Sequence, residues 1–168
     1  MEDQFTFKCS TCGEVHRGLP DLAFDSPLQY HSMSDDERRS AQLTSDTCVI
    51  NDEDFFVRGL LQIPVHGRDE PFAYGVWVSL SRKNFERYQE LFNASDRLDE
   101  PPYFGWLCNK LPGYPDTLNL KTNVHLQPYP LRPRIELEPT DHPLALEQGK
   151  GISIERLQEI IEANTHAA

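Results

Sequence analysis

The sequence predicts an α+β fold with a mainly antiparallel sheet, two or three flanking helices and an N-terminal appendage that resembles a zinc knuckle. Its 13 prolines favour loops and short strands over a helical bundle. Strand-like segments follow one another with few helical segments between them, whereas a doubly wound fold alternates the two. The 168 residues fit one domain. We therefore expect a single domain over 1–168, with a zinc-binding part at 5–50 and an α+β core at 55–163.

The first elements are short. Residues 5–8 (FTFK) are typical of a strand that enters a tight turn built on Cys9, Cys12 and Gly13. A helix is predicted over 34–43, because Ser34 is followed three residues later by Glu37, the spacing of a capping box. Its apolar face is thin, so we expect it on the surface.

Four strands and a helix are predicted in the middle of the chain. Residues 46–67 read as two strands around a turn at 51–54, since the second strand places apolar residues on one face by a period of two. These residues are Phe55, Val57, Leu61, Ile63 and Val65. Residues 72–80 (FAYGVWVSL) are apolar on both faces, which is typical of a central strand. Ser81 then caps a helix whose apolar stripe runs along Phe85, Tyr88, Leu91 and Phe92. After a loop at 93–103, residues 104–107 form a short strand.

Two strands and a helix complete the prediction. Residues 120–127 alternate apolar and polar side chains, which indicates one solvated face, and residues 134–138 repeat the pattern. The last helix begins at Ser153 and places Ile154, Leu157, Ile160 and Ile161 on one side.

The charge of the chain argues against two classes of partner. Its formal net charge is −11, and residues 1–54 alone carry 12 acidic against 4 basic side chains. Such a field repels phosphate backbones, so we expect no nucleic acid and no membrane as partner. A basic protein or a small ligand is compatible with it. The start MEDQFTFKC lacks the basic and apolar segments of a signal peptide, and no stretch is long and apolar enough to cross a bilayer. We expect a cytoplasmic protein.

The pair Cys9 and Cys12 predicts a structural zinc site. A C-x2-C turn followed by glycine delivers two thiolates, and zinc takes four thiolate or imidazole ligands. His16 lies four residues past Cys12, and Cys48 opens a strand, so Cys9, Cys12, His16 and Cys48 would make a closed shell. Two other interpretations remain: a redox-active pair, which the strand-like flanks disfavour, and unligated thiols.

A second set of residues is a candidate ligand or partner surface. These residues are Trp106, Asn109, Tyr114, Asp116, His125 and His142. Aromatic residues of this kind wall pockets but more commonly form cores, and no metalloprotease, P-loop or serine-hydrolase motif accompanies them. His166 lies close to the end of the chain, where residues are commonly disordered, so we expect no role for it.

Five blocks together resemble a bacterial family that carries only a domain-of-unknown-function label and has an N-terminal CxxCGxxH knuckle. They are CSTCGEVHRGLPDLAF, CVINDEDFFVRGLLQIPV, FAYGVWVSLS, YFGWLCNKLPGYPDTLNLKT and RPRIELEPTDHPLALEQ. The resemblance spans about residues 5–163 and implies a single-domain prokaryotic protein without an assigned activity. It also implies matching positions for Cys9, Cys12, His16 and Cys48 but none for Cys108, which leaves Cys108 as a small buried residue.

The sequence therefore supports two principal hypotheses. The first is a non-enzymatic binding or regulatory domain with a structural zinc ion, which engages a protein or small ligand. The second is a metal-dependent hydrolase whose zinc keeps a position open for water, with His125, His142 or Asp141 as acid or base. A disulfide-exchange protein is a third, weaker hypothesis.

Overall fold

The computed structural model describes residues 5–18 and 22–166, and it confirms the α+β class. The strands are β1 (Thr6–Lys8), β2 (Val15–Arg17), β3 (Leu22–Ala23), β4 (Ala41–Leu43), β5 (Thr47–Ile50), β6 (Asp54–Ile63), β7 (Phe72–Leu80), β8 (Tyr103–Leu107), β9 (Lys121–His125) and β10 (Arg134–Leu137). The helices are α1 (Leu28–His31), α2 (Asp35–Arg38), α3 (Arg82–Glu90), the 3-10 turn η1 (Arg97–Asp99), α4 (Pro143–Lys150) and α5 (Ile154–Thr165).

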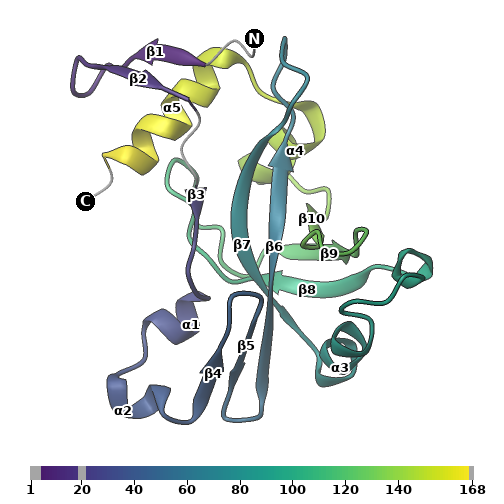
Figure 1. Cartoon of the computed structure of the whole chain (residues 1–168). Helices are drawn as coiled ribbons and strands as arrows, with labels where there is room; N and C mark the ends of the chain where they lie inside the picture. The colour runs from purple at the N-terminus through teal and green to yellow at the C-terminus, as the bar shows by residue number, and fades with distance from the viewer. Residues whose placement is uncertain (1–4, 19–21, 167–168) are drawn as a thin grey trace.

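Strands β6 to β10 close into a small mixed barrel (Figure 1). Neighbouring strands from β6 through β10 pair antiparallel, and β10 then pairs parallel with β6 to complete the ring. Strands β5 and β4 extend the sheet beyond β6, and β3 adds to β7 in parallel. The predicted antiparallel pairing thus holds for most of the sheet, but its closure into a barrel was not predicted.

Two glycines inside strands permit this closure. At Gly59 of β6, a Cβ atom would lie 2.6 Å from Ile135 Cδ1 and 2.8 Å from the carbonyl oxygen of Pro133 on the β10 side. At Gly105 of β8, a Cβ atom would lie 2.5 Å from the carbonyl oxygen of Ser79 in β7. Only glycine allows neighbouring strands to approach so closely, which is a common reason for glycine at a barrel corner.

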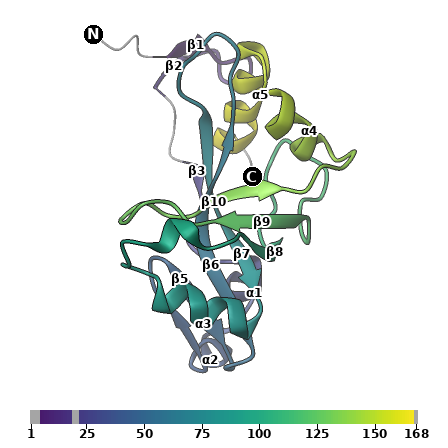
Figure 2. The same ribbon diagram turned by 90° about the vertical axis from the view of Figure 1, so that its right-hand side faces the viewer.

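The barrel interior holds the main core. The alternation predicted for the second strand of 46–67 is confirmed, because the side chains of Val57, Leu61 and Ile63 are fully buried there. Tyr74 and Val78 of the neighbouring strand β7 pair with Leu61 and Val57 and are buried in the same core. Figures 1 and 2 show α4, α5 and the β1–β2 hairpin at one end of the long β6–β7 hairpin, with α1, α2 and α3 at the other.

A second, smaller core covers the outer face of β6 and β7. It contains Cys48, Ile50, Phe56, Trp77 and Cys108, and the segment from Phe24 to Ala41 packs over it. The indole Nε1 of Trp77 donates a 2.8 Å hydrogen bond to the carbonyl oxygen of Phe24. The apolar character of 72–80 on both faces therefore reflects burial against two cores.

Several helix predictions need correction. The capping box of Ser34 and Glu37 is present, but it begins only the four-residue α2, and residues 41–43 form β4 instead of the rest of a helix. Helices α3 and α5 begin after Ser81 and Ser153 as expected. The eight-residue α4 was not predicted, although Pro143 at its first position is a known start signal.

The N-terminal hairpin of β1 and β2 is not a free appendage. Phe5, Phe7 and Cys9 belong to the same buried cluster as the barrel interior. Within the described residues, no helix combines the length and apolar character that a membrane span requires.

Candidate metal centre

The turn between β1 and β2 carries the two cysteines of the CxxC pair. The amide of Cys9 donates to the carbonyl of Glu14 over 2.8 Å, and the amide of Gly13 donates back to the carbonyl of Cys9 over 3.0 Å. Gly13 has φ of +75°, a conformation that glycine adopts without steric cost. This tight turn places both sulfur atoms on the same side of the hairpin as His16 of β2.

Four side chains converge at this turn: Cys9, Cys12, His16 and His166. One potential ligand atom from each lies within 4.8 Å of all the others. The Sγ of Cys9 is 3.2 Å from Nε2 of His166, and the Sγ of Cys12 is 3.3 Å from Nε2 of His16. Tetrahedral zinc with ordinary bond lengths holds a sulfur and a nitrogen ligand about 3.5 Å apart, close to both of these distances. The group could therefore hold a metal ion through two thiolates and two imidazoles, the donors that zinc prefers.

Helix α5 positions the fourth candidate ligand, which lies far along the chain from the other three. His166 follows the last residue of α5, and its amide donates to the carbonyl of Glu162 one turn earlier. The carboxylate of Glu162 accepts two hydrogen bonds from Ser10, one from the amide and one from the hydroxyl, each of 2.7 Å. These bonds hold the pKa of Glu162 below its ordinary value. Glu162 thus ties the cysteine turn directly to the helix that carries His166.

Neighbouring groups orient the four candidate ligands. The ring of His16 stacks on Phe7 with a centroid distance of 5.4 Å, and the ring of His166 meets His16 edge-on at 5.8 Å. The amide of Thr11 lies 3.4 Å from the Sγ of Cys9, where it can donate to a thiolate. The Cys9 side chain is buried, while Cys12 and His166 are exposed, so one wall of the site faces solvent.

Cys48, the predicted fourth ligand, lies in another part of the fold. It belongs to β5, is fully buried, and packs in the second core beside Phe56 and Trp77. Burial raises the pKa of Cys48 to about 11, which disfavours the thiolate that a metal requires. The structure puts His166 beside the other three residues, so the first fifty residues do not supply the whole group. His166, which we expected to have no role, is the member of this group that the sequence did not reveal.

The predicted ligand surface separates into residues with different surroundings. Trp106 is 41% exposed on the outer face of β8, beside Phe104. Asn109 is only 2% exposed: its Oδ1 accepts from the amide of Trp77 and its Nδ2 donates to the carbonyl of Ser26. Asn109 is therefore a buried link between β7 and the segment over the second core.

Tyr114, Asp116 and His142 also make local structural contacts. The hydroxyl of Tyr114 donates to the carboxylate of Glu147, and burial together with that bond raises its pKa. Nδ1 of His142 accepts from the amide of Leu144 over 3.1 Å and so caps α4. Its Nε2 then carries the proton and donates to the carbonyl of Asp116 over 3.0 Å.

His125 lies apart from this group. Its Nε2 is 3.4 Å from a carboxylate oxygen of Glu136, across the β9–β10 pair. His125 and His142 thus have separate partners, His125 across the β9–β10 pair and His142 at the start of α4.

A further hollow lies near the opposite end of β6 from α3 and was not predicted. It has a volume of about 630 Å³ and is bordered by β10, α4 and the loop after β6. Arg68, Arg134 and Glu136 supply charges at its wall. The side-chain amide of Gln148 is already hydrogen-bonded, because it accepts from the amide of Leu137 and donates to the carbonyl of Ile135. The residues around it share no motif or spacing, so the sequence carries no signal for it.

Comparison with known proteins gives one match. The model of a family described as "Uncharacterized protein conserved in bacteria (DUF2199)" matches residues 8–152. The matched region contains Cys9, Cys12 and His16 and ends before His166. No curated protein and no solved structure matches the chain.

Proposed function

The chain belongs to the DUF2199 family of bacteria, and we propose that it is a non-enzymatic binding domain organised by a structural zinc ion. The observation that carries this proposal is the convergence of four candidate ligands, Cys9, Cys12, His16 and His166, within 4.8 Å. Four protein ligands fill a tetrahedral shell and leave no position for a reactive water molecule. This donor set favours a structural role over the hydrolase alternative, which needs an open position.

The zinc ion would join the two ends of the described chain. Cys9 and His166 are 157 positions apart, and the ion would bridge the β1–β2 hairpin to α5. Structural zinc in small sites contributes on the order of 10 kcal/mol to folding. A bridge of that strength would fix the hairpin and α5 on the same end of the barrel.

Metal analysis of matched variants tests the site. We expect one zinc per chain after purification without added metal, loss of that zinc in His166→Ala, and its retention in Cys48→Ala. Near-ultraviolet circular dichroism of the buried Trp77 reports separately on the barrel. Retention of zinc by His166→Ala together with its loss from Cys48→Ala would overturn the assignment. A zinc ion with only three protein ligands by X-ray absorption would instead support the hydrolase.

We propose the outer face of β8 as the binding surface and a basic protein segment as its partner. Phe104 and Trp106 are both exposed, their rings meet edge-on at 5.0 Å, and they border a hollow of about 330 Å³. Glu53 and Asp54 line the same hollow. Aromatic faces beside carboxylates attract lysine and arginine side chains. The excess of acidic residues in 1–54 adds to this attraction.

Tryptophan fluorescence can test the surface with defined peptides. A lysine-rich peptide should quench Trp106 and lose at least tenfold in affinity in Trp106→Ala, because cation–π contact and apolar contact disappear together. Leu146→Ala is the matched control, since Leu146 is also exposed but lies on α4. Equal binding by Trp106→Ala and the unmodified protein, or tighter binding of a glutamate-rich peptide, would exclude this surface while leaving the zinc site untouched.

A further inference from the structure

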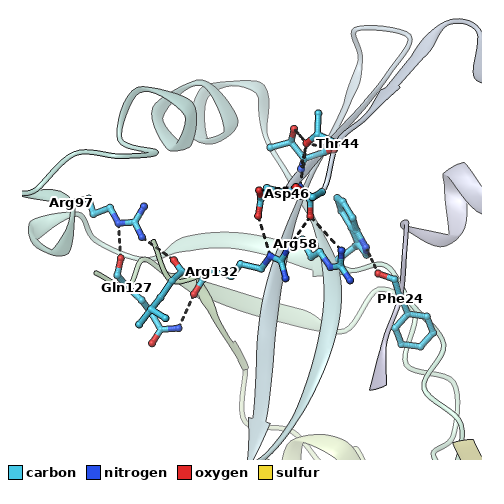
Figure 3. Close-up of polar contacts among 11 residues, drawn as sticks. Phe24, Thr44, Asp46, Arg58, Arg97, Gln127 and Arg132 are labelled. Atoms are coloured by element: carbon cyan, nitrogen blue, oxygen red, sulfur yellow. Dashed lines mark hydrogen bonds and ion pairs between the residues drawn. The ribbon is translucent and has the colours of Figure 1, made fainter. Parts of the chain in front are cut away.

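Two arginines, one in β6 and one in the loop before β10, reach the same turn on the outside of the barrel. Arg132, just before β10, donates from Nε to Asp46 Oδ1 over 3.0 Å and lies 3.4 Å from the carbonyl of Ser45. Arg58 of β6 approaches the same carbonyl with its Nη1, also at 3.4 Å. Figure 3 shows Arg58 and Arg132 converging on the turn that precedes β5.

The charges at this turn do not balance. Asp46 is paired with Arg132, and Arg58 makes no ion pair among the described residues. The Nε of Arg58 is buried and has no hydrogen-bond acceptor there. Buried polar groups are nearly always satisfied, so the guanidinium of Arg58 is incompletely paired within the described residues. The guanidinium of Arg58 also lies over the ring of Trp77, 5.8 Å from its centroid, which limits its freedom to seek solvent.

A hollow of about 290 Å³ adjoins the two guanidinium groups. Arg58 and Arg132 line it, and among the residues that the structure describes they are the charged ones at its wall. The remaining wall is made of small or apolar residues of β3, β6 and β7, including Ala23, Ala73 and Gly75. A Cβ atom on Gly75 would lie 3.0 Å from that of Ala23, so glycine at this position allows β3 to approach β7 and shape the hollow.

We propose that this hollow, the Arg58–Arg132 hollow, binds a small anion through a phosphate or carboxylate group. Guanidinium groups present planar pairs of donors that match both kinds of oxyanion, and such charge-assisted bonds are stronger than neutral ones. An oxyanion in the hollow would neutralise the positive charge that Arg58 leaves unpaired among the described residues. The volume admits a ligand of only a few heavy atoms beyond that group. This site is distinct from the zinc site and from the Trp106 surface.

Calorimetric titration of the full chain tests the proposal. Inorganic phosphate and acetate are titrated separately at constant ionic strength, with a neutral sugar as the negative control. We expect binding of at least one of the two anions and at least tenfold weaker binding in Arg58→Gln. Arg58→Lys should lose nearly as much, because it keeps the charge but not the planar donor pair. The preferred anion tells whether the natural ligand carries phosphate or carboxylate.

Two further variants separate binding from folding. Ala73→Leu should fill the hollow and abolish binding without altering either arginine. Arg39→Gln is the matched control, because Arg39 is a highly exposed arginine on a different element and pairs only with Asp36. Thermal melts confirm that each variant is folded. Absence of heat with both anions, or equal affinity in the Arg58, Ala73 and Arg39 variants, would overturn the proposal.

Discussion

The barrel and the β1–β2 hairpin with its candidate metal ligands are held in place by different means. The barrel buries apolar side chains from five strands, and residues such as Val57, Leu61 and Val78 have no exposed surface. The β1–β2 hairpin contributes only Phe5, Phe7 and Cys9 to that cluster. Its other attachments are polar: the bonds between Ser10 and Glu162, and the four candidate metal ligands. Burial of apolar side chains therefore holds the barrel, whereas we expect the hairpin to depend on α5 and on a metal ion bound by the four candidate ligands.

Removal of the metal should produce the largest difference between the hairpin and the barrel. We expect a strong chelator to raise amide hydrogen exchange at least tenfold in residues 5–18 and in the last turn of α5, because zinc of this type contributes on the order of 10 kcal/mol. Exchange in β6 and β7 should change by less than twofold, since their protection comes from the barrel core. Mass spectrometry of peptic fragments measures both regions in one experiment.

A uniform rise of exchange across the chain would contradict the division into two regions. No change anywhere would mean that the hairpin stays docked by Phe5 and Phe7 without metal. Re-addition of zinc is the control, because it should restore the original protection of the hairpin.

Substitution of Gly105 should in turn destabilise the barrel. Gly105→Ala places a Cβ atom 2.5 Å from the Ser79 carbonyl oxygen, and backbone cannot move aside as a flexible side chain can. We expect a loss of about 3 kcal/mol in the free energy of unfolding, at the upper end of the range for overpacking. Urea denaturation followed by fluorescence measures it. Zinc content should remain at one per folded chain, because the hairpin lies at the end of the barrel.

Gly149→Ala is the matched control for this substitution. Gly149 lies inside α4, and a Cβ atom there meets nothing within 4 Å. Alanine should stabilise the helix by up to about 1 kcal/mol. If both substitutions had the same effect, the close approach of β7 and β8 would not be what requires glycine at position 105.

The two regions also differ in how far the sequence predicts them. Strands β6, β9 and β10 follow from alternation of apolar residues, and β7 follows from a short run that is apolar on both faces; both are local patterns. The closure of the barrel depends on the pairing of β10 with β6, between residues 74 positions apart such as Leu60 and Arg134. The glycines at 59 and 105 were visible in the sequence as interruptions of strands, and such glycines do signal tight approaches. Their partners were not visible, so closure could not be derived.

The metal site illustrates the same limit more strongly. Cys9, Cys12 and His16 lie within eight residues, and their spacing alone identified them. The choice between Cys48 and His166 depends on where β5 and α5 lie in space. Cys48 and Ile50 are two residues apart in β5 and share its buried face, a pattern that indicates a core position for Cys48. The position of His166 close to the end of the sequence argued against a role for it. Proximity along the chain therefore favoured Cys48, whereas the structure places His166 beside the other three residues.

The smallest expected effect concerns the link between the regions, Glu162. Glu162→Gln should weaken zinc binding by about tenfold or less. Mutation of a residue that hydrogen-bonds to a metal ligand typically lowers metal affinity 10-fold to 100-fold, and Glu162 contacts the hairpin through Ser10 instead of holding a ligand directly. The pKa of this carboxyl group is lowered in the folded protein, so its contribution is complete above the ordinary value of 4.5 and is lost as pH falls through the lowered value. The ratio of zinc affinities between the two proteins should therefore be constant from pH 5.5 to 7.5.

Competition with a coloured chelator at both ends of that pH range measures the ratio, even though each affinity itself falls as the thiols and imidazoles bind protons. Glu159→Gln serves as the control, because Glu159 lies on the same helix but pairs with Arg156. A ratio that changes with pH would show that Glu162 acts through the titration of a ligand such as His166. A ratio of one would show that the metal ligands alone hold the hairpin to α5, and the link through Ser10 would then be a consequence of docking rather than a cause.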